Sequence, residues 1–234
     1  MMSPANPSDT FTQSPARRAK ARQSYEGTFS APVQPGPVDM VAVSAWLREN
    51  LPDDVILTNG AGNFTVWPNK FFKFGSKARL LAPQSGAMGY GLPAAIAAKV
   101  AFPMRMVVCF AGDGDFQMNC QELGTAMQAG SQPIVLILNN GIYGTIRAHQ
   151  ERNYPARVSG TTLENPDFVS LAKSYGFHAE RVEATRDFAA AFEHARNSTT
   201  GAVLDIAISP EALTPRQTLS QMRDTALASQ KARA

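Results

Sequence analysis

The chain has 234 residues, 44% of them hydrophobic and 18% charged, a composition that predicts a globular domain with a core rather than a disordered chain. No apolar run approaches the roughly 18 residues of a membrane-spanning helix, and no apolar N-terminal segment precedes a small-residue cleavage site. Cys109 and Cys120 give no metal-ligand spacing, and two isolated thiols suit a reducing compartment. We therefore expect a soluble, cytoplasmic protein with no membrane partner.

The net charge of +3 comes from the two ends of the chain. Residues 1–36 and residues 211–234 each hold four basic against two acidic side chains, whereas the stretch between them is slightly acidic. Nucleic-acid-binding surfaces gather Lys and Arg on one face, often with aromatic side chains on which bases stack. The central stretch has no such pattern, so we expect no nucleic-acid partner.

The sequence predicts three regions. Residues 1–38 are rich in Pro, Ser and Ala without sustained periodicity, which predicts a disordered lead or linker; a transit peptide is the alternative. Residues 39–210 form the expected folded domain, beginning with a helix at about 39–50 that is apolar on one face. Residues 211–234 form a C-terminal tail, expected as a surface helix or a disordered arm.

Short apolar strands alternate with helices in the central region. Strands are predicted at 55–58, 106–111, 134–138 and 202–208, and helices at about 87–101, 117–129, 166–175 and 186–197. This alternation indicates an α/β fold of three layers, a parallel sheet with helices on both faces. Ligands of such sheets bind beyond the carboxyl ends of the strands. Three of these strands are followed by Gly, Asp or Asn, so we expect the functional site at that edge.

The segment 110–119 runs from a predicted strand into a helix. Gly112 and Gly114 permit close backbone approach, and Asp113 presents one carboxylate at the strand end. Mg²⁺ favours one or two carboxylates together with substrate phosphates, and a helix N-terminus favours phosphate. An Asp-Gly pair after a strand is also a common turn, so this segment alone leaves both interpretations open.

Asn139 and Asn140 follow the next predicted strand. Twenty-four residues separate Gly114 from Asn139, enough for one helix and one strand, which places the Asn pair at the same sheet edge as Asp113. An Asn carbonyl oxygen is a suitable Mg²⁺ ligand, and a loop carbonyl two residues later adds another. Asn-Asn-Gly is also a common turn, so this half of the pattern is equally open by itself.

Together, the Gly-Asp-Gly triplet, the spacer and the Asn pair resemble the thiamine diphosphate signature of enzymes that act next to the carbonyl of 2-oxo acids. Residues 83–95 resemble acetolactate synthase large subunits, and residues 139–147 also resemble benzoylformate decarboxylase. The resemblance spans about residues 37–210 and indicates the C-terminal, diphosphate-binding domain of this family. It implies thiamine diphosphate and Mg²⁺ as cofactors, and decarboxylase or carboligase activity on a small 2-oxo acid.

The resemblance also implies roles for individual residues. It places Mg²⁺ on the Asp113 carboxylate, the Asn140 side chain and the backbone carbonyl of Ile142. The implied contacts to the diphosphate are Gly112, Gly114, Asp115, Gly141, Ile142 and Tyr143.

Two further residues correspond to positions around the organic part of the cofactor. Met88 matches the large apolar side chain under the thiazolium ring, although a methionine here also suits an ordinary core position. Gly86 matches the residue whose carbonyl receives the 4′-amino group. The resemblance implies a bent cofactor that deprotonates its own carbon and acts as the electron sink when CO₂ leaves.

The sequence departs from the family pattern at two positions. Relatives carry Gln and His in the loop aligned with residues 62–64, where this chain offers only Asn63 as a hydrogen-bond donor to the diphosphate, so strict acetolactate synthase chemistry is not implied. Asp115 stands where many relatives have Ser. We expect its carboxylate to cap the following helix through backbone N–H groups; the alternative is that it faces away from the diphosphate.

The resemblance covers only one domain of the family. The Glu that activates the cofactor belongs to a pyrimidine-binding domain, and no Glu of this chain fits that role, so its catalytic residues are unknown. We expect a pyrimidine-binding domain or subunit as partner, in a homo- or hetero-oligomer; the alternative is a non-catalytic, cofactor-binding fragment of a longer enzyme. A nucleotide-binding Rossmann-like domain is disfavoured, because residues 86–91 give GxxGxG rather than GxGxxG, with no suitable strand directly before them.

Overall fold

A computed structural model describes residues 14–232, which are built around one parallel sheet of six strands in the order β2-β1-β3-β4-β6-β5. The strands are β1 (Ile56–Asn59), β2 (Arg79–Leu81), β3 (Val107–Gly112), β4 (Ile134–Asn139), β5 (His178–Val182) and β6 (Ala202–Ala207). The helices are α1 (Pro15–Glu26), α2 (Met40–Asn50), α3 (Val66–Lys70), α4 (Gly91–Ala101), α5 (Asp113–Phe116), α6 (Glu122–Gln128), α7 (Gly144–Asn153), α8 (Phe168–Ser174), α9 (Phe188–Arg196) and α10 (Leu219–Lys231), with 3₁₀ turns at Gly27–Phe29, Asn63–Thr65 and Thr185–Asp187.

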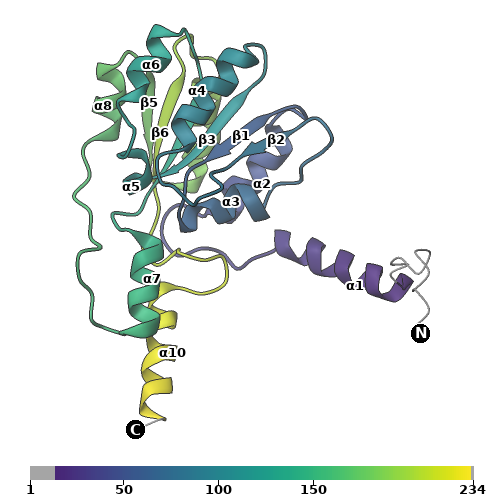
Figure 1. Ribbon diagram of the computed structural model, residues 1–234, viewed down its shortest axis with the longest axis vertical. Helices are drawn as coiled ribbons and strands as arrows, with labels where there is room; N and C mark the ends of the chain where they lie inside the picture. Colours follow the sequence, from purple (N-terminus) through teal and green to yellow (C-terminus); the bar gives the residue numbers. More distant parts are fainter. Residues whose placement is uncertain (1–13, 233–234) are drawn as a thin grey trace, which may run out of the picture.

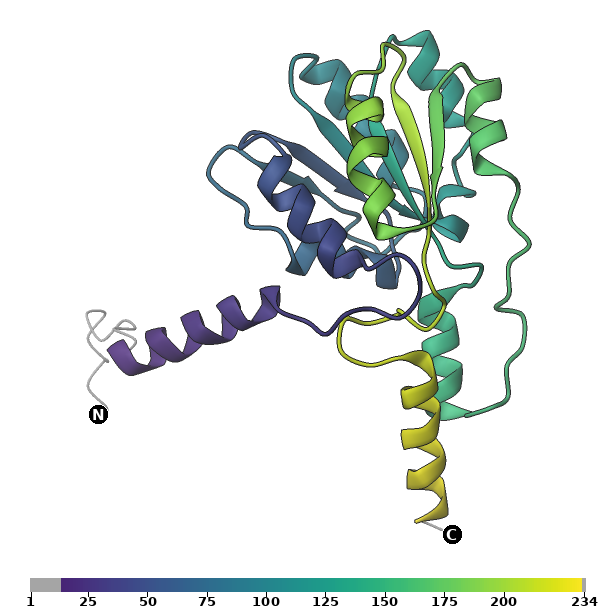
Figure 2. The same ribbon diagram turned by 180° about the vertical axis from the view of Figure 1, so that it is seen from behind.

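Helices cover both faces of the sheet, which confirms the predicted three-layer α/β fold. On one face α4, α6 and α8 pack against strand residues such as Cys109 and Val135 (Figure 1). On the other face α2, α3 and α9 pack against the alternate strand residues, among them Phe110 and Leu136 (Figure 2). Successive strand side chains therefore point into two separate apolar layers, as expected for strands buried on both sides.

The predicted strands are the central ones of the sheet, and the structure adds the two edges. β5 alternates between buried and partly exposed positions, and β2 has three residues that are partly or fully exposed. Neither strand is a continuous apolar run, so neither carries the signal that identified the other four. β2 ends five residues before Gly86, in a stretch where no strand was predicted.

The C-terminal segment forms a small helical unit with α7. Figures 1 and 2 show α7 and α10 side by side, projecting beyond the carboxyl edge of the sheet. A third apolar cluster of Ile142, Ala148, Leu213, Leu219 and Met222 joins them. Helix α10 begins with a capping box between Thr218 and Gln221, so the surface helix is the outcome among the two expectations for this tail.

The structure departs from the expected disordered lead in part of residues 1–38. Residues 15–26 are helical, with Ser14 accepting the N–H of Arg17 and Pro15 in the first turn. The Ala, Arg, Lys and Gln side chains of this segment are good helix formers, which explains a helix that buries none of its residues. Residues 1–13 lie outside the described part. None of the helices among residues 14–232 is long and apolar enough to span a membrane.

Candidate functional site

A pocket opens where the carboxyl ends of β1, β3 and β4 meet. These strands are parallel neighbours, and the pairing of Asn59 with Phe110 and of Gly112 with Leu138 brings their last residues to one edge. All but two of the residues implicated from the sequence line this pocket: Asn63, Met88, Gly112, Asp113, Gly114, Asp115, Asn140, Ile142 and Tyr143. Gly86 lies instead on an exposed loop, and Gly141 lies in the loop after β4 but is not one of the lining residues.

Asp113 is a buried carboxylate without a cationic partner. It is 3% exposed, and its Oδ2 accepts the N–H of Gly141 at 2.8 Å and Nδ2 of Asn165 at 2.7 Å. Burial raises the pKa of Asp113 above its usual value, and these hydrogen bonds oppose the rise. None of the ion pairs among the described residues includes Asp113. Its charge is therefore compensated only by dipoles, which suits a site that receives a cation.

The loop after β4 is held in a defined shape beside Asp113. Gly141 has φ of +67°, a left-handed conformation that favours glycine, and this turn directs its N–H at the carboxylate. Oδ1 of Asn140 accepts the N–H of Ile142 at 3.1 Å. Residues 161–163 fix the loop from outside, through an N–H from Tyr143 to the carbonyl of Thr161 and a bridge to Ile142. The two halves of the sequence motif thus meet as predicted.

The donor set fits a hard cation that keeps phosphate ligands. One carboxylate, one amide oxygen and one backbone carbonyl are the oxygen ligands that Mg²⁺ accepts, with substrate phosphates and water completing the shell. Within residues 14–232, no three His, Cys, Asp or Glu side chains gather into a metal cluster. A cation at Asp113 would therefore have neutral oxygen atoms, water or a bound phosphate as its other ligands.

Aromatic rings cover both glycines of the motif. A Cβ on Gly112 would lie 2.8 Å from the ring of Phe64, and one on Gly114 would lie 2.6 Å from the ring of Tyr143. Any side chain larger than hydrogen would displace these rings. The two glycines therefore let the backbone of α5 approach the loops after β1 and β4 closely.

The structure corrects the expectation for Asp115. Its side chain does not cap α5; Oδ1 instead accepts the N–H of Ala61 at 3.0 Å and the N–H of Gly89 at 2.9 Å. The carboxylate thus joins the loop after β1 to the loop before α4, which are distant from it in sequence. Burial raises the pKa of Asp115 to about 6, and the two N–H donors oppose the rise. Backbone N–H groups are its partners, as expected, but they come from other loops.

Asn63 and Met88 line the pocket from two different loops. Nδ2 of Asn63 donates to the carbonyl of Leu213 at 3.2 Å, which connects the loop after β1 to the C-terminal segment. Met88 is half-buried and lies on the exposed loop that contains Gly86.

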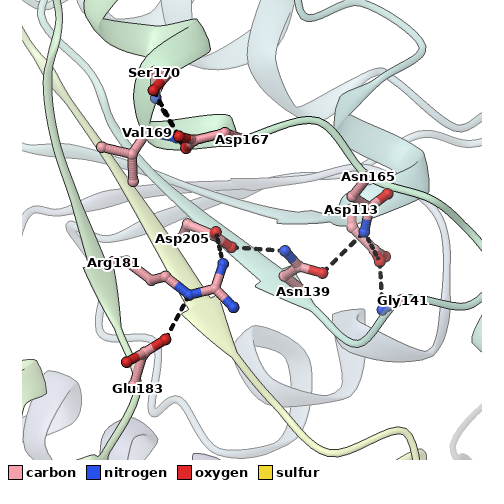
Figure 3. A network of polar contacts seen from close by, with 10 residues as sticks. All are labelled: Asp113, Asn139, Gly141, Asn165, Asp167, Val169, Ser170, Arg181, Glu183 and Asp205. Atoms are coloured by element: carbon pink, nitrogen blue, oxygen red, sulfur yellow. Dashed lines mark hydrogen bonds and ion pairs between the residues drawn. The ribbon is translucent and has the colours of Figure 1, made fainter.

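Two polar residues near the pocket were not identified from the sequence. Asn165 donates to Asp113, and the buried Asp205 accepts Nδ2 of Asn139 at 2.9 Å (Figure 3). Asn165 stands just before α8 and Asp205 within β6, so only the folded chain brings them to the motif. A single Asp within the otherwise apolar strand 202–207 was the available signal, because buried charges are rare without a partner.

Comparison with known proteins assigns the fold and site to a family. Residues 60–206 match the family model described as "Thiamine pyrophosphate enzyme, C-terminal TPP binding domain", TPP being thiamine diphosphate. The chain is 37% identical over 165 residues to an acetolactate synthase of Arthrospira platensis, with 70% of this chain and 28% of the relative covered. Isozyme 2 large subunit of the same enzyme from Escherichia coli (strain K12) is 34% identical over 164 residues, with 69% of this chain and 30% of the relative covered.

The matched region is therefore most of this chain but a small share of each relative. A probable acetolactate synthase large subunit from Methanococcus aeolicus follows the same proportions, with 69% of this chain and 27% of the relative covered. The chain spans less than a third of the length of each of these relatives. The family model covers more than half of the chain, including β3, β4 and the residues that line the pocket. The chain belongs to the thiamine pyrophosphate enzymes, in the family of their C-terminal TPP-binding domain.

Proposed function

We propose that this chain binds thiamine diphosphate together with Mg²⁺ and serves as the diphosphate-binding half of an acetolactate synthase-like enzyme. Residues 39–210 form the cofactor-binding unit, and the activity is decarboxylation or carboligation of a small 2-oxo acid. The observation that carries the proposal is the meeting of Asp113 with the loop that follows Asn140, through the Gly141 N–H at 2.8 Å.

In this proposal, different residues of the pocket hold the cation and the diphosphate. Asp113, the Asn140 side chain and the Ile142 carbonyl hold the cation, and the backbone at Gly112 and Gly114 lies beside the diphosphate. When bound, thiamine diphosphate supplies an electron sink for breaking or making the bond next to a carbonyl.

Three further residues support the organic part of the cofactor and its access. Met88 offers an apolar surface to the thiazolium ring, and the exposed loop at Gly86 presents its carbonyl to the aminopyrimidine. Tyr143 packs against Gly114 and closes the pocket on the side of α7, which limits water at the diphosphate.

A second chain or domain completes the site in this proposal. No Glu lines the pocket among the described residues, and the nearby Glu151 is fully buried in a bidentate ion pair with Arg223. The proton-transferring Glu therefore comes from a pyrimidine-binding domain outside these residues, in a homo- or hetero-oligomer. The short coverage of the relatives supports the same conclusion.

The proposal is tested by thermal unfolding of the full chain with thiamine diphosphate, with Mg²⁺ and with both. A ligand at about 100 times its dissociation constant stabilises a protein by about 2.7 kcal/mol. That free energy raises the unfolding temperature of a chain of this size by roughly 5 to 11 °C. We expect this rise only when both components are present.

Two matched substitutions test the role of the carboxylate. Asp113→Asn keeps the size of the side chain and one acceptor oxygen but removes the charge, so we expect the rise to disappear. Asp53→Asn changes an exposed carboxylate before β1, at the opposite edge of the sheet, and should leave the rise intact. A wild-type chain that gains no stability from the pair of ligands contradicts the proposal.

The alternative, a non-catalytic cofactor-binding fragment, is favoured for the isolated chain by the missing Glu. CO₂ release from pyruvate, measured with and without a co-expressed pyrimidine-binding chain, separates the two. Release that requires both chains supports the split enzyme. Cofactor binding without release in either case supports the fragment.

A further inference from the structure

A continuous chain of polar contacts runs from the edge of the sheet to Asp113 (Figure 3). Arg181 on β5 donates to Oδ2 of Asp205 on β6 at 2.7 Å, and Oδ1 of Asp205 accepts Nδ2 of Asn139 at 2.9 Å. Oδ1 of Asn139 accepts Nδ2 of Asn165 at 2.9 Å. The same Nδ2 of Asn165 donates to Oδ2 of Asp113 at 2.7 Å.

The carboxylates at the two ends determine which way each amide faces. An ionised carboxylate only accepts hydrogen bonds, so the NH₂ group of Asn139 must point to Asp205. The carbonyl oxygen of Asn139 then faces Asn165, which must donate a hydrogen bond to it from its own NH₂ group. That NH₂ group has a second hydrogen, and it reaches Asp113. A flipped amide at either position would place oxygen against oxygen.

Both the oxygen and the nitrogen of the Asn165 amide are hydrogen-bonded in this arrangement. Its Oδ1 accepts Nε2 of Gln117 at 2.9 Å, so both ends of the amide are engaged. The Asp205 side chain is 2% exposed and paired with Arg181, which anchors the chain of contacts within the sheet. Asn165 itself stands at the point where the chain returns from α7 to α8.

We propose that Asn165 is a positioning residue for the metal site, and that Asp205 sets the direction of its amide through Asn139. The Asn165 amide and the Gly141 N–H hold Oδ2 of Asp113, which leaves the other carboxylate oxygen for the cation. This inference rests on the proposed function, because it assumes that Asp113 binds Mg²⁺.

The physical consequence concerns metal affinity rather than folding. A carboxylate that rotates freely must be ordered when the cation binds, whereas one held by two donors is already in place. Partners that orient metal ligands typically contribute 10- to 100-fold to metal affinity. Removal of the Asn165 donor should therefore weaken cation binding by at least about tenfold.

The experiment uses Mn²⁺ in place of Mg²⁺, because free Mn²⁺ is measured directly by electron paramagnetic resonance. The full chain is titrated with Mn²⁺ at fixed thiamine diphosphate, as wild type, Asn165→Leu and Asn165→Ser. Leucine removes the donor at similar size, and serine stays polar but is too short to reach Asp113. Thermal unfolding without ligands checks that each variant is folded. If the leucine variant is not folded, the serine variant alone decides the test.

The matched control is Asp167→Ala, which disturbs the same segment without touching the contacts of Asn165. Asp167 caps α8 by accepting the N–H groups of Val169 and Ser170, each at 3.0 Å. We expect Mn²⁺ affinity to fall at least about tenfold in both Asn165 variants and less than about twofold in the control. Affinity for thiamine diphosphate should recover at saturating Mn²⁺, which a general loss of structure would not allow.

Each remaining outcome overturns a definite statement. Unchanged Mn²⁺ affinity in the Asn165 variants, or an equal loss in Asp167→Ala, overturns the positioning role and leaves the proposed metal site standing. A wild-type chain that binds no Mn²⁺ with thiamine diphosphate overturns the metal site, and the positioning role with it.

Discussion

Replacement of Asp115 by Asn should stabilise the protein at neutral pH and have little effect in acid. The carboxylate is 3% exposed and has no ion-pair partner among the described residues. Burial raises the pKa of Asp115 from 3.8 to about 6. The native state therefore binds the proton of the Asp115 carboxyl more tightly than the unfolded state does. The contribution of this side chain to stability falls as pH rises between about 4 and 6 and is constant above about 6.

The size of the effect follows from the shift in pKa. A shift of one pKa unit corresponds to 1.36 kcal/mol. The shift in the pKa of Asp115 from 3.8 to about 6 therefore makes the ionised side chain cost about 3 kcal/mol of folding free energy at pH 7. Asn has no proton to lose, and its carbonyl oxygen can still accept the N–H groups of Ala61 and Gly89. The difference between variant and wild type should therefore grow from about 0.5 kcal/mol at pH 4 to at most about 3 kcal/mol at pH 7.

Urea unfolding of both proteins at pH 4, 5, 6 and 7 measures this difference. Other buried carboxylates, such as Asp113 and Asp205, also have raised pKa values, but they are common to both proteins and cancel in the comparison. Asp53→Asn, at an exposed position, should give a curve parallel to wild type. Parallel curves for Asp115→Asn and wild type would refute the argument that burial of this charge is costly.

Two other substitutions follow from close packing and from a buried ion pair. Gly60→Ala would place its Cβ against the Asp115 carboxylate and push it from its donors, so calorimetry should show a loss of about 2 kcal/mol or more together with weaker cofactor binding; unchanged stability would contradict this contact. Arg223→Ala would leave the fully buried Glu151 without its cationic partner, with one N–H donor remaining from Ala156, and should cost about 3 kcal/mol in urea unfolding. The double change with Glu151→Met should cost less, and equal losses would show that the charge is not the cause.

The sequence predicted the part of the fold that is buried on both faces. The four central strands are mostly apolar and buried, and their helices lie close to the predicted positions. The edge strand β5 reads His-Ala-Glu-Arg-Val, whose polar side chains gave no strand signal. Helix α7 is mostly polar and packs against the distant α10, and the two helices share an apolar cluster that includes Ala148 and Met222. Such elements depend on tertiary contacts, which local patterns do not contain.

For the site, too, the sequence predicted some residues and missed the partners of others. Asp113, Asn140 and the glycines belong to a motif with fixed spacing, so their meeting in one pocket followed from the order of strands and helices. The partners of Asp115 lie in loops 26 and 54 residues away, and no spacing rule connects them. Asn165 reaches Asp113 only because the long segment after α7 returns to the end of β3.

The charges at the end of β3 bear on how a diphosphate can enter this pocket. Asp113 and Asp115 are both buried, and they face different loops: the first accepts an N–H from Gly141, the second accepts N–H groups from Ala61 and Gly89. No basic side chain pairs with either among the described residues. A diphosphate placed beside two unpaired carboxylates would be repelled strongly in a pocket of low polarity. A divalent cation, if held by Asp113, would offset most of that repulsion. Charge balance therefore supports joint binding of cation and diphosphate, independently of the ligand geometry.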